Sequence, residues 1–235
     1  MINRCSILAV ILLLALCGKA RSQEIIYTLT GTGDGELGEN VFSGASFTIT
    51  SVADIRQVMN LSPGLYIVTN STATVSVSGI GKATFTIPTT SISNQRIPGV
   101  GISAPVQNLL IFMADNNVKF ASYGLTNNLG PLTGEPRFDY AAGFATTMGD
   151  FTLTSATNAT FQAILIPLLS LSRSGTNLAL SWTTNAPGFQ LQGSPDLGMS
   201  TWSNVTNSVL TANGQNQVTV SPTNNQTFYR LYKQQ

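Results

Sequence analysis

The sequence predicts an all-β protein with two antiparallel, sandwich-like domains that follow an N-terminal signal peptide. Apolar and polar residues alternate with period two along much of the chain, as half-buried strands require. Thr, Ser, Asn and Gly are abundant and only 9% of residues are charged, a mix that with β-branched residues is typical of secreted β proteins. We expect a signal peptide at 1–22, a larger sandwich or flattened barrel at 23–166 and a small sandwich at 168–235.

Residues 1–22 have the parts of a secretory signal. Arg4 supplies a positive start, and residues 6–16 (SILAVILLLAL) form an apolar core that is too short to span a bilayer. Ala20-Arg21-Ser22 is a small-x-small cleavage site, so we expect the mature chain to begin at Gln23. These features predict a secreted, cell-surface or periplasmic protein without a transmembrane span in its mature chain.

Both cysteines, Cys5 and Cys17, lie in the signal region, and the chain contains no histidine. Cys17 would be acylated in a lipoprotein signal, but Leu16 is larger than the residue expected before such a cysteine, so lipid anchoring is disfavoured. The mature chain then lacks disulfides, thiolate or imidazole metal ligands, and Ser-His-Asp or Cys-His catalytic groups. Carboxylates, Lys, Tyr, Ser and Thr remain for chemistry, and oxygen ligands remain for calcium.

The net charge of the mature chain is small. Residues 23–235 carry eight basic and ten acidic side chains, without a cluster of basic ones. Nucleic-acid binding depends on such clusters, so we expect no nucleic acid among the partners.

A glycine-rich stretch, Gly33-Asp-Gly-Glu-Leu-Gly38, matches the pattern G-x-G-x-x-G and follows a strand-like run at 25–29. A dinucleotide-binding loop requires a helix directly after it, whereas residues 39–49 are polar and then alternate. The sequence therefore predicts a strand end, a turn near 38–40 and a return strand through Phe47. Glycine at alternate positions permits bulges or a close approach of strands.

The same stretch carries several oxygen donors. Asp34, Glu36, Glu39 and Asn40 fall within seven residues, but they lack the EF-hand spacing. A solvated hairpin tip is the favoured interpretation, and a calcium site at Asp34, Glu36 and Glu39 is the alternative.

Further strands are expected in the larger domain. Residues 72–78 and 83–87 alternate around a turn at 79–81, which predicts a hairpin over 72–89. A short helix is expected over Val52–Met59. The other strands expected in this domain are 46–50, 108–113, 150–154 and 160–164.

After Pro167 the chain changes to short alternating strands separated by turn residues, which predicts a small β-sandwich with Trp182 in its core. In the last strand Phe228 and Arg230 share one face, while Tyr229 and Leu231 share the other. The expected strands are 170–175, 177–182, 189–192, 201–205, 217–220 and 228–232.

Residues 168–235 contain S-W, P-G-F-x-L-Q, T-W and F-Y-R-L in that order. This order resembles a C-terminal module of fibronectin-III-like or Ig-like sandwich type that is found on many secreted proteins of environmental bacteria. Residues 27–166, with TLTGTGDGELG and DFTLTSATNATFQA, resemble more loosely a β-rich domain of exported bacterial proteins. The resemblance implies an exported bacterial protein and brings no catalytic residues.

Aromatic side chains in the small domain have two interpretations. Trp202, Tyr229 and Tyr232 are candidate platforms for stacking sugar rings, with Trp202 the principal candidate ligand-binding residue. Large aromatic residues also fill the cores of small sandwiches, and this second interpretation is favoured.

A carboxylate pair is the other candidate for chemistry. In a strand, Glu135 and Asp139 point to one side, with Tyr140 beside them, and could act on a glycosidic bond. Arg137 shares that face and could instead pair with both acids, so a structural role is favoured.

We therefore expect a non-catalytic, secreted or cell-surface protein that binds or scaffolds, with polysaccharide or matrix components as partners and no cofactor other than the calcium considered above. One alternative is a polysaccharide-degrading enzyme that uses carboxylates alone. Another is a structural subunit that assembles by strand addition, with Gln23–Thr32 as a donor strand.

Overall fold

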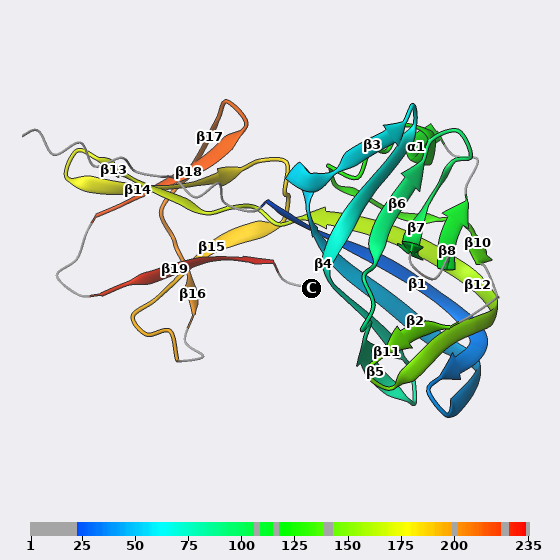
Figure 1. Ribbon diagram of the computed structural model, residues 1–235. Coiled ribbons are helices and arrows are strands. Elements are labelled where there is room, and N and C mark those ends of the chain that lie inside the picture. The colour runs from blue at the N-terminus through cyan, green and yellow to red at the C-terminus, as the bar shows by residue number, and fades with distance from the viewer. Residues whose placement is uncertain are drawn as a thin grey trace, which may run out of the picture.

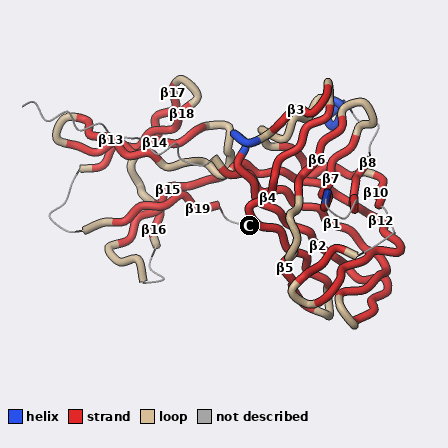
Figure 2. Tube along the Cα trace, in the orientation of Figure 1, coloured by secondary structure: helices blue, strands red, loops and turns tan. Residues whose placement is uncertain are grey.

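The computed structural model describes residues 23–105, 109–114, 118–138, 143–198, 202–221 and 226–233. Antiparallel strands make up most of these residues, and helix is confined to short segments (Figure 2). The predicted all-β, sandwich-like class is confirmed. The expected signal peptide at 1–22, with Cys5 and Cys17, lies outside the described residues.

Strands β1 to β12 belong to one large sheet. Their bounds are β1 (Glu24–Leu37), β2 (Asn40–Asp54), β3 (Met59–Ser62), β4 (Leu65–Val77), β5 (Gly81–Thr84), β6 (Thr90–Asn94), β7 (Gly99–Ala104), β8 (Leu109–Ala114), β9 (Leu129–Thr133), β10 (Glu135–Phe138), β11 (Phe144–Thr146) and β12 (Gly149–Leu165). Neighbouring strands follow the order β10-β8-β7-β6-β4-β2-β1-β12-β11, while β3 and β5 pair with β4, and β9 pairs with β12.

The large sheet is strongly curled (Figure 1). β10 pairs with β8 at one end of the sheet and also packs against β12 near the other end, so the two ends approach each other. Alternate residues of the long strands point inward and are buried, as the burial of every second residue from Ile25 to Leu37 in β1 demonstrates. Period-two alternation therefore produces one continuous apolar interior.

Two aromatic clusters fill this interior. Phe161 packs against Tyr27, Phe120 and Tyr123, with ring centroids 5.9–6.2 Å apart. Phe151 contacts three further rings, each at 6.4 Å: Phe42, Phe47 and Phe85. Both clusters centre on β12, which places this strand at the middle of the packing.

The segment containing α1 (Val118–Ala121) is fixed against the interior by buried polar contacts. The Tyr27 hydroxyl donates to the Leu125 carbonyl at 2.6 Å, and the Ser93 hydroxyl donates to the Tyr123 carbonyl at 2.8 Å. The Tyr123 hydroxyl donates to the carbonyl of Asn127 at 3.0 Å. Burial raises the pKa of the Tyr27 and Tyr123 hydroxyls above its ordinary value, so both remain donors.

The glycine-rich stretch forms the predicted hairpin. β1 continues to Leu37, the chain turns at Gly38, where φ is 63°, and β2 begins at Asn40. A Cβ on Gly33 would lie 2.2 Å from the carbonyl oxygen of Ser155 in β12. The ladder between β1 and β12 shifts register in the same region. The predicted close approach and bulges are confirmed, and a strand takes the place of the helix that a dinucleotide-binding loop needs.

The predicted helix over Val52–Met59 is wrong. β2 extends to Asp54, a 3-10 turn occupies Ile55–Gln57, and β3 begins at Met59. Backbone pairing of β2 with both β1 and β4 accounts for the strand, because two ladders outweigh a weak local preference for helix.

Two strands that were expected separately belong to a single long strand in the structure. The ranges 150–154 and 160–164 both lie in β12, which bulges between them and stays paired with β1. The predicted hairpin over 72–89 is confirmed as β4 and β5, with Val75 opposite Ala83.

The described residues between Ser170 and Lys233 form two smaller sheets that face each other (Figure 1). Their order is β13-β14-β18-β17 in one sheet and β16-β15-β19 in the other. Trp182 is 3% exposed in the shared core, as predicted. The strand bounds are β13 (Ser170–Ser174), β14 (Asn177–Thr183), β15 (Phe189–Ser194), β16 (Ser203–Asn204), β17 (Val209–Ala212), β18 (Gln215–Val220) and β19 (Phe228–Lys233).

Candidate functional site

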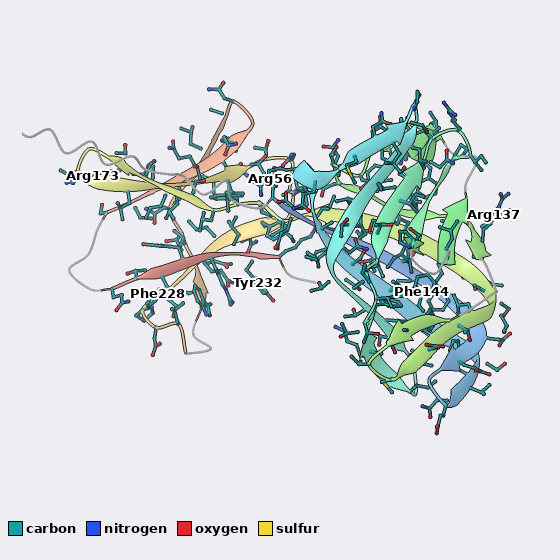
Figure 3. The ribbon with its side chains drawn as sticks, viewed as in Figure 1. Arg56, Arg137, Phe144, Arg173, Phe228 and Tyr232 are labelled. Atoms are coloured by element: carbon teal, nitrogen blue, oxygen red, sulfur yellow. The ribbon has the colours of Figure 1, made fainter. Side chains whose placement is uncertain are left out.

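The two faces of β19 have different environments. Tyr229 and Leu231 pack against the core between the two small sheets. Because side chains alternate along a strand, Phe228, Arg230 and Tyr232 project from the opposite, outer face. Figure 3 labels Phe228 and Tyr232 along this strand. The predicted division of the β19 side chains into two faces is therefore confirmed.

Trp202 joins this outer face just before β16 begins. The guanidinium carbon of Arg230 lies 4.3 Å from the centroid of the Trp202 ring and 5.2 Å from that of the Tyr232 ring. Both distances fall within the range of cation–π attraction. We call Trp202, Arg230 and Tyr232 the arginine–aromatic cluster.

Neighbouring amide side chains hold Arg230 in place. Its Nε and Nη2 atoms both donate to Oε1 of Gln192, at 3.0 and 2.9 Å. Gln192 lies opposite Arg230 in the ladder between β15 and β19, and its Nε2 donates to Oδ1 of Asn204 at 3.1 Å. Gln192 is only 9% exposed. The position of the guanidinium is therefore set by a chain of hydrogen bonds through three strands of one sheet.

The cluster remains open to solvent. Tyr232 is 42% exposed, and Trp202 and Arg230 are half-buried. Trp202 thus packs on Arg230 at the surface, while Trp182 occupies the core. Core filling, the favoured interpretation for the aromatic residues of this domain, is wrong for Trp202 and Tyr232 and right for Tyr229.

A polar hollow lies elsewhere in the small domain, and none of Trp202, Arg230 and Tyr232 lines it. It opens between the ends of β15, β16 and β18, and hydroxyl and amide side chains form much of its wall. The residues that line it include Ser194, Ser203, Asn204, Thr206, Asn207, Thr227 and Tyr229.

The candidate calcium residues lie on the hairpin of β1 and β2. The Asp34 carboxylate accepts hydrogen bonds from the Ser43 hydroxyl at 2.7 Å, the Gly44 backbone N–H at 2.8 Å and the Ser155 hydroxyl at 2.6 Å. These hydrogen bonds, that of Ser155 most of all, hold the pKa of Asp34 below its ordinary value. Asp34 therefore ties the hairpin to β12.

Glu36 and Glu39 are exposed on the same hairpin. Over the described ranges, no three side chains of the types His, Cys, Asp and Glu come together as a group that could hold a metal ion. The calcium site at Asp34, Glu36 and Glu39 stays a prediction, and the hydrogen bonds of Asp34 favour a structural role for that residue.

The candidate carboxylate pair is only partly described. Glu135 and Arg137 are exposed on β10, whereas Asp139 and Tyr140 lie outside the described residues. Arg137 makes no ion pair with Glu135 in the part of the chain that the structure covers.

The ion pair found among the described residues joins Arg56 to Asp54. Hydrogen bonds from Arg56 lower the pKa of Asp54.

The segment Gln23–Thr32 is not an unpaired donor strand in this structure. Nearly all of it belongs to β1, which pairs with β2 on one side and β12 on the other. Both edges of its backbone are therefore occupied, which corrects the expectation for this segment.

Among the described residues, no helix has both the length and the hydrophobicity needed to cross a membrane. Comparison of the chain with protein-family models, with curated proteins and with solved structures finds no match. The fibronectin-III-like or Ig-like resemblance stays a prediction.

Proposed function

We propose that this protein is an exported, non-catalytic binding protein that attaches to polysaccharide or to a glycan-rich matrix through the arginine–aromatic cluster. The observation that carries the proposal is the presence of two aromatic rings, Trp202 and Tyr232, on an open sheet face, with Arg230 fixed against both.

The chemistry of this face suits sugars. Trp and Tyr side chains combine an apolar ring with one polar atom, so they suit ligands that have both apolar and polar surfaces. A sugar ring is such a ligand, because it has C–H groups on its faces and hydroxyls around its edge. Exposed polar groups next to the rings, such as Gln190 and Asn204, can orient those hydroxyls.

The pKa shifts of Asp34 and Asp54 make these two carboxylates poor candidates for the proton donor of a glycosidase. A glycosidase needs a carboxylic acid whose pKa is raised, so that it can donate a proton to the leaving group. Asp34 and Asp54 shift in the opposite direction, because each accepts several hydrogen bonds in its ionised form.

The test is a binding screen with the full chain, expressed with residues 1–22 so that the cell carries out any processing. Affinity electrophoresis with soluble polysaccharides and pull-down with insoluble ones would measure binding, while reducing-sugar release would report hydrolysis. Each assay is run with calcium and with a chelator. We expect binding without sugar release and without loss under chelator.

Variants locate the binding surface. Trp202→Ala and Tyr232→Ala each remove an aromatic ring, and truncation of such an anchor costs about 2 kcal/mol or more, or about 30-fold in affinity. Leu210→Ala is the matched control, because Leu210 is a large exposed side chain, 64% exposed, on β17 of the other small sheet. Equal losses in all three variants would contradict the proposed surface, and sugar release would establish the enzyme alternative.

A second candidate, self-assembly by strand addition, has one specific observation in its favour. Among the described strands β13 pairs only with β14, and β19 only with β15, so each has an open edge. A partly apolar hollow lies between these two edges, lined by Leu169, Leu171, Leu180, Phe228 and Tyr229 among others. Edges of this kind can pair with a second copy of the chain. A molar mass that rises with concentration in light scattering would support assembly, and a constant monomer mass would reject it.

A further inference from the structure

We propose that the arginine–aromatic cluster selects acidic glycans, and that Arg230 binds the carboxylate of a uronic acid residue whose ring stacks on Trp202 or Tyr232. This inference rests on the proposed glycan-binding function and adds the ligand class. Its basis is the unused edge of the Arg230 guanidinium.

A guanidinium has two edges that can each donate a pair of parallel N–H groups. In Arg230 the Nε–Nη2 edge is engaged by Oε1 of Gln192. The other edge consists of Nη1 and the second N–H of Nη2, and it has no acceptor in the described part of the chain. A planar carboxylate fits such an edge with two parallel hydrogen bonds.

The positive charge of Arg230 also has no ion-pair partner among the described residues. Within the described ranges the ion pair found is Arg56–Asp54, far along the chain from the cluster. Gln192 and the aromatic rings offer neutral contacts to Arg230, so they orient the cation without cancelling its charge. A ligand carboxylate would therefore meet a charged donor that is already positioned, and little side-chain freedom would be lost on binding.

The distribution of charge along the sequence agrees with an anionic ligand. Residues 168–235 contain three basic side chains and one acidic side chain, Asp196, whereas residues 23–166 contain five basic and nine acidic ones. The part of the chain that carries the cluster is thus positive within an otherwise acidic protein. Anions are attracted to this part and repelled by the rest.

The surroundings of Arg230 favour a sugar acid over an acidic peptide. The guanidinium lies over the Trp202 and Tyr232 rings, so a sugar ring that stacks on the uncovered part of either ring can bring its carboxylate to Arg230. Recognition of acidic peptides instead uses clusters of arginines, and Arg230 is accompanied on β19 by one other basic residue, Lys233, which lies over Phe189.

The experiment measures the affinity of the full-length protein for three acidic oligosaccharides, oligogalacturonate, oligoalginate and oligoglucuronate, by calorimetry. Each is compared with its methyl ester, which keeps the sugar and removes the charge. We expect at least one acid to bind tenfold or more tightly than its ester. This comparison uses the unmodified protein, so it does not depend on how any variant folds.

Three variants assign the preference to the guanidinium edge. Arg230→Gln removes charge and edge together, Arg230→Lys keeps the charge and removes the edge, and Lys233→Gln removes the same charge from the same strand. We expect both Arg230 variants to lose the preference for acid over ester and Lys233→Gln to keep most of it. Thermal unfolding of each variant checks that it is folded.

The outcomes separate this inference from the function on which it rests. Equal affinity for acids and esters, with binding that still depends on Trp202, overturns the acidic selectivity and leaves glycan binding in place. Equal losses in Arg230→Gln and Lys233→Gln identify diffuse charge attraction and also overturn it. Equal competition by poly-glutamate overturns the preference for sugars. Absence of binding to acidic, esterified and neutral glycans overturns both proposals.

Discussion

Replacing Gly35 by alanine tests the close contact between β1 and β12. A Cβ on Gly35 would lie 2.0 Å from the carbonyl oxygen of Thr152 and 2.9 Å from the nearest ring carbon of Phe42. The first obstacle is backbone and cannot rotate away, so the two strands would have to separate by about 1 Å in a close-packed interior. Overpacking of this kind typically costs 1–3 kcal/mol, and we expect about 3 kcal/mol for Gly35→Ala.

Thermal unfolding followed by circular dichroism measures this cost. For a chain of this size each kcal/mol lowers Tm by about 2–4 °C, so Gly35→Ala should melt about 6–12 °C below the natural protein. Gly124→Ala is the matched control, because its Cβ would meet nothing nearer than the Tyr66 ring at 3.7 Å, an ordinary contact. If the two variants melt at the same temperature, β1 and β12 do not approach as closely as described.

Three further substitutions test the interior and the hairpin. Tyr27→Phe leaves the buried Leu125 carbonyl without its donor and should cost about 1–3 kcal/mol in urea unfolding. Phe151→Ala removes the ring at the centre of an aromatic cluster and should cost about 3–5 kcal/mol; a loss below 1 kcal/mol would contradict the packing. The pKa of Asp34 is lowered on folding, so its contribution is present above the unfolded value of about 3.8 and disappears as pH falls through the folded value. The Tm of the natural protein should therefore fall more on acidification below pH 4 than that of Asp34→Asn, and identical profiles would refute the role of Asp34.

The fold class could be predicted because its signals are local. Alternation at 72–78 and the turn at 79–81 specify a hairpin without reference to the rest of the chain, and the structure contains it as β4 and β5. The turn in the glycine-rich stretch was also predicted correctly, because the absence of a helical pattern after Gly38 excludes a nucleotide-binding loop. The helix expected at Val52–Met59 failed because pairing with β1 and β4, which is not local, decided the conformation.

The candidate site was predicted only in part, for the same reason. Trp202 was a candidate because of its residue type, and alternation placed Arg230 on the opposite face of its strand from Tyr229, but the contact between Trp202 and Arg230 depends on how β15, β16 and β19 pair. Gln192, which holds Arg230, lies 38 residues before it in the sequence. The role of Gln192 depends on the register in which β15 pairs with β19. Side-chain alternation limits the possible registers to shifts of two residues but does not choose among them.

Acrylamide quenching of tryptophan fluorescence, with and without a bound oligosaccharide, tests most directly whether the arginine–aromatic cluster is the binding surface. The chain has two tryptophans, and Trp182 is 3% exposed, so quenching reports chiefly on Trp202. We predict that an oligosaccharide that binds will shield Trp202 from acrylamide and that Trp202→Phe will abolish the change. Saturating binding with unchanged quenching in the natural protein would contradict the account.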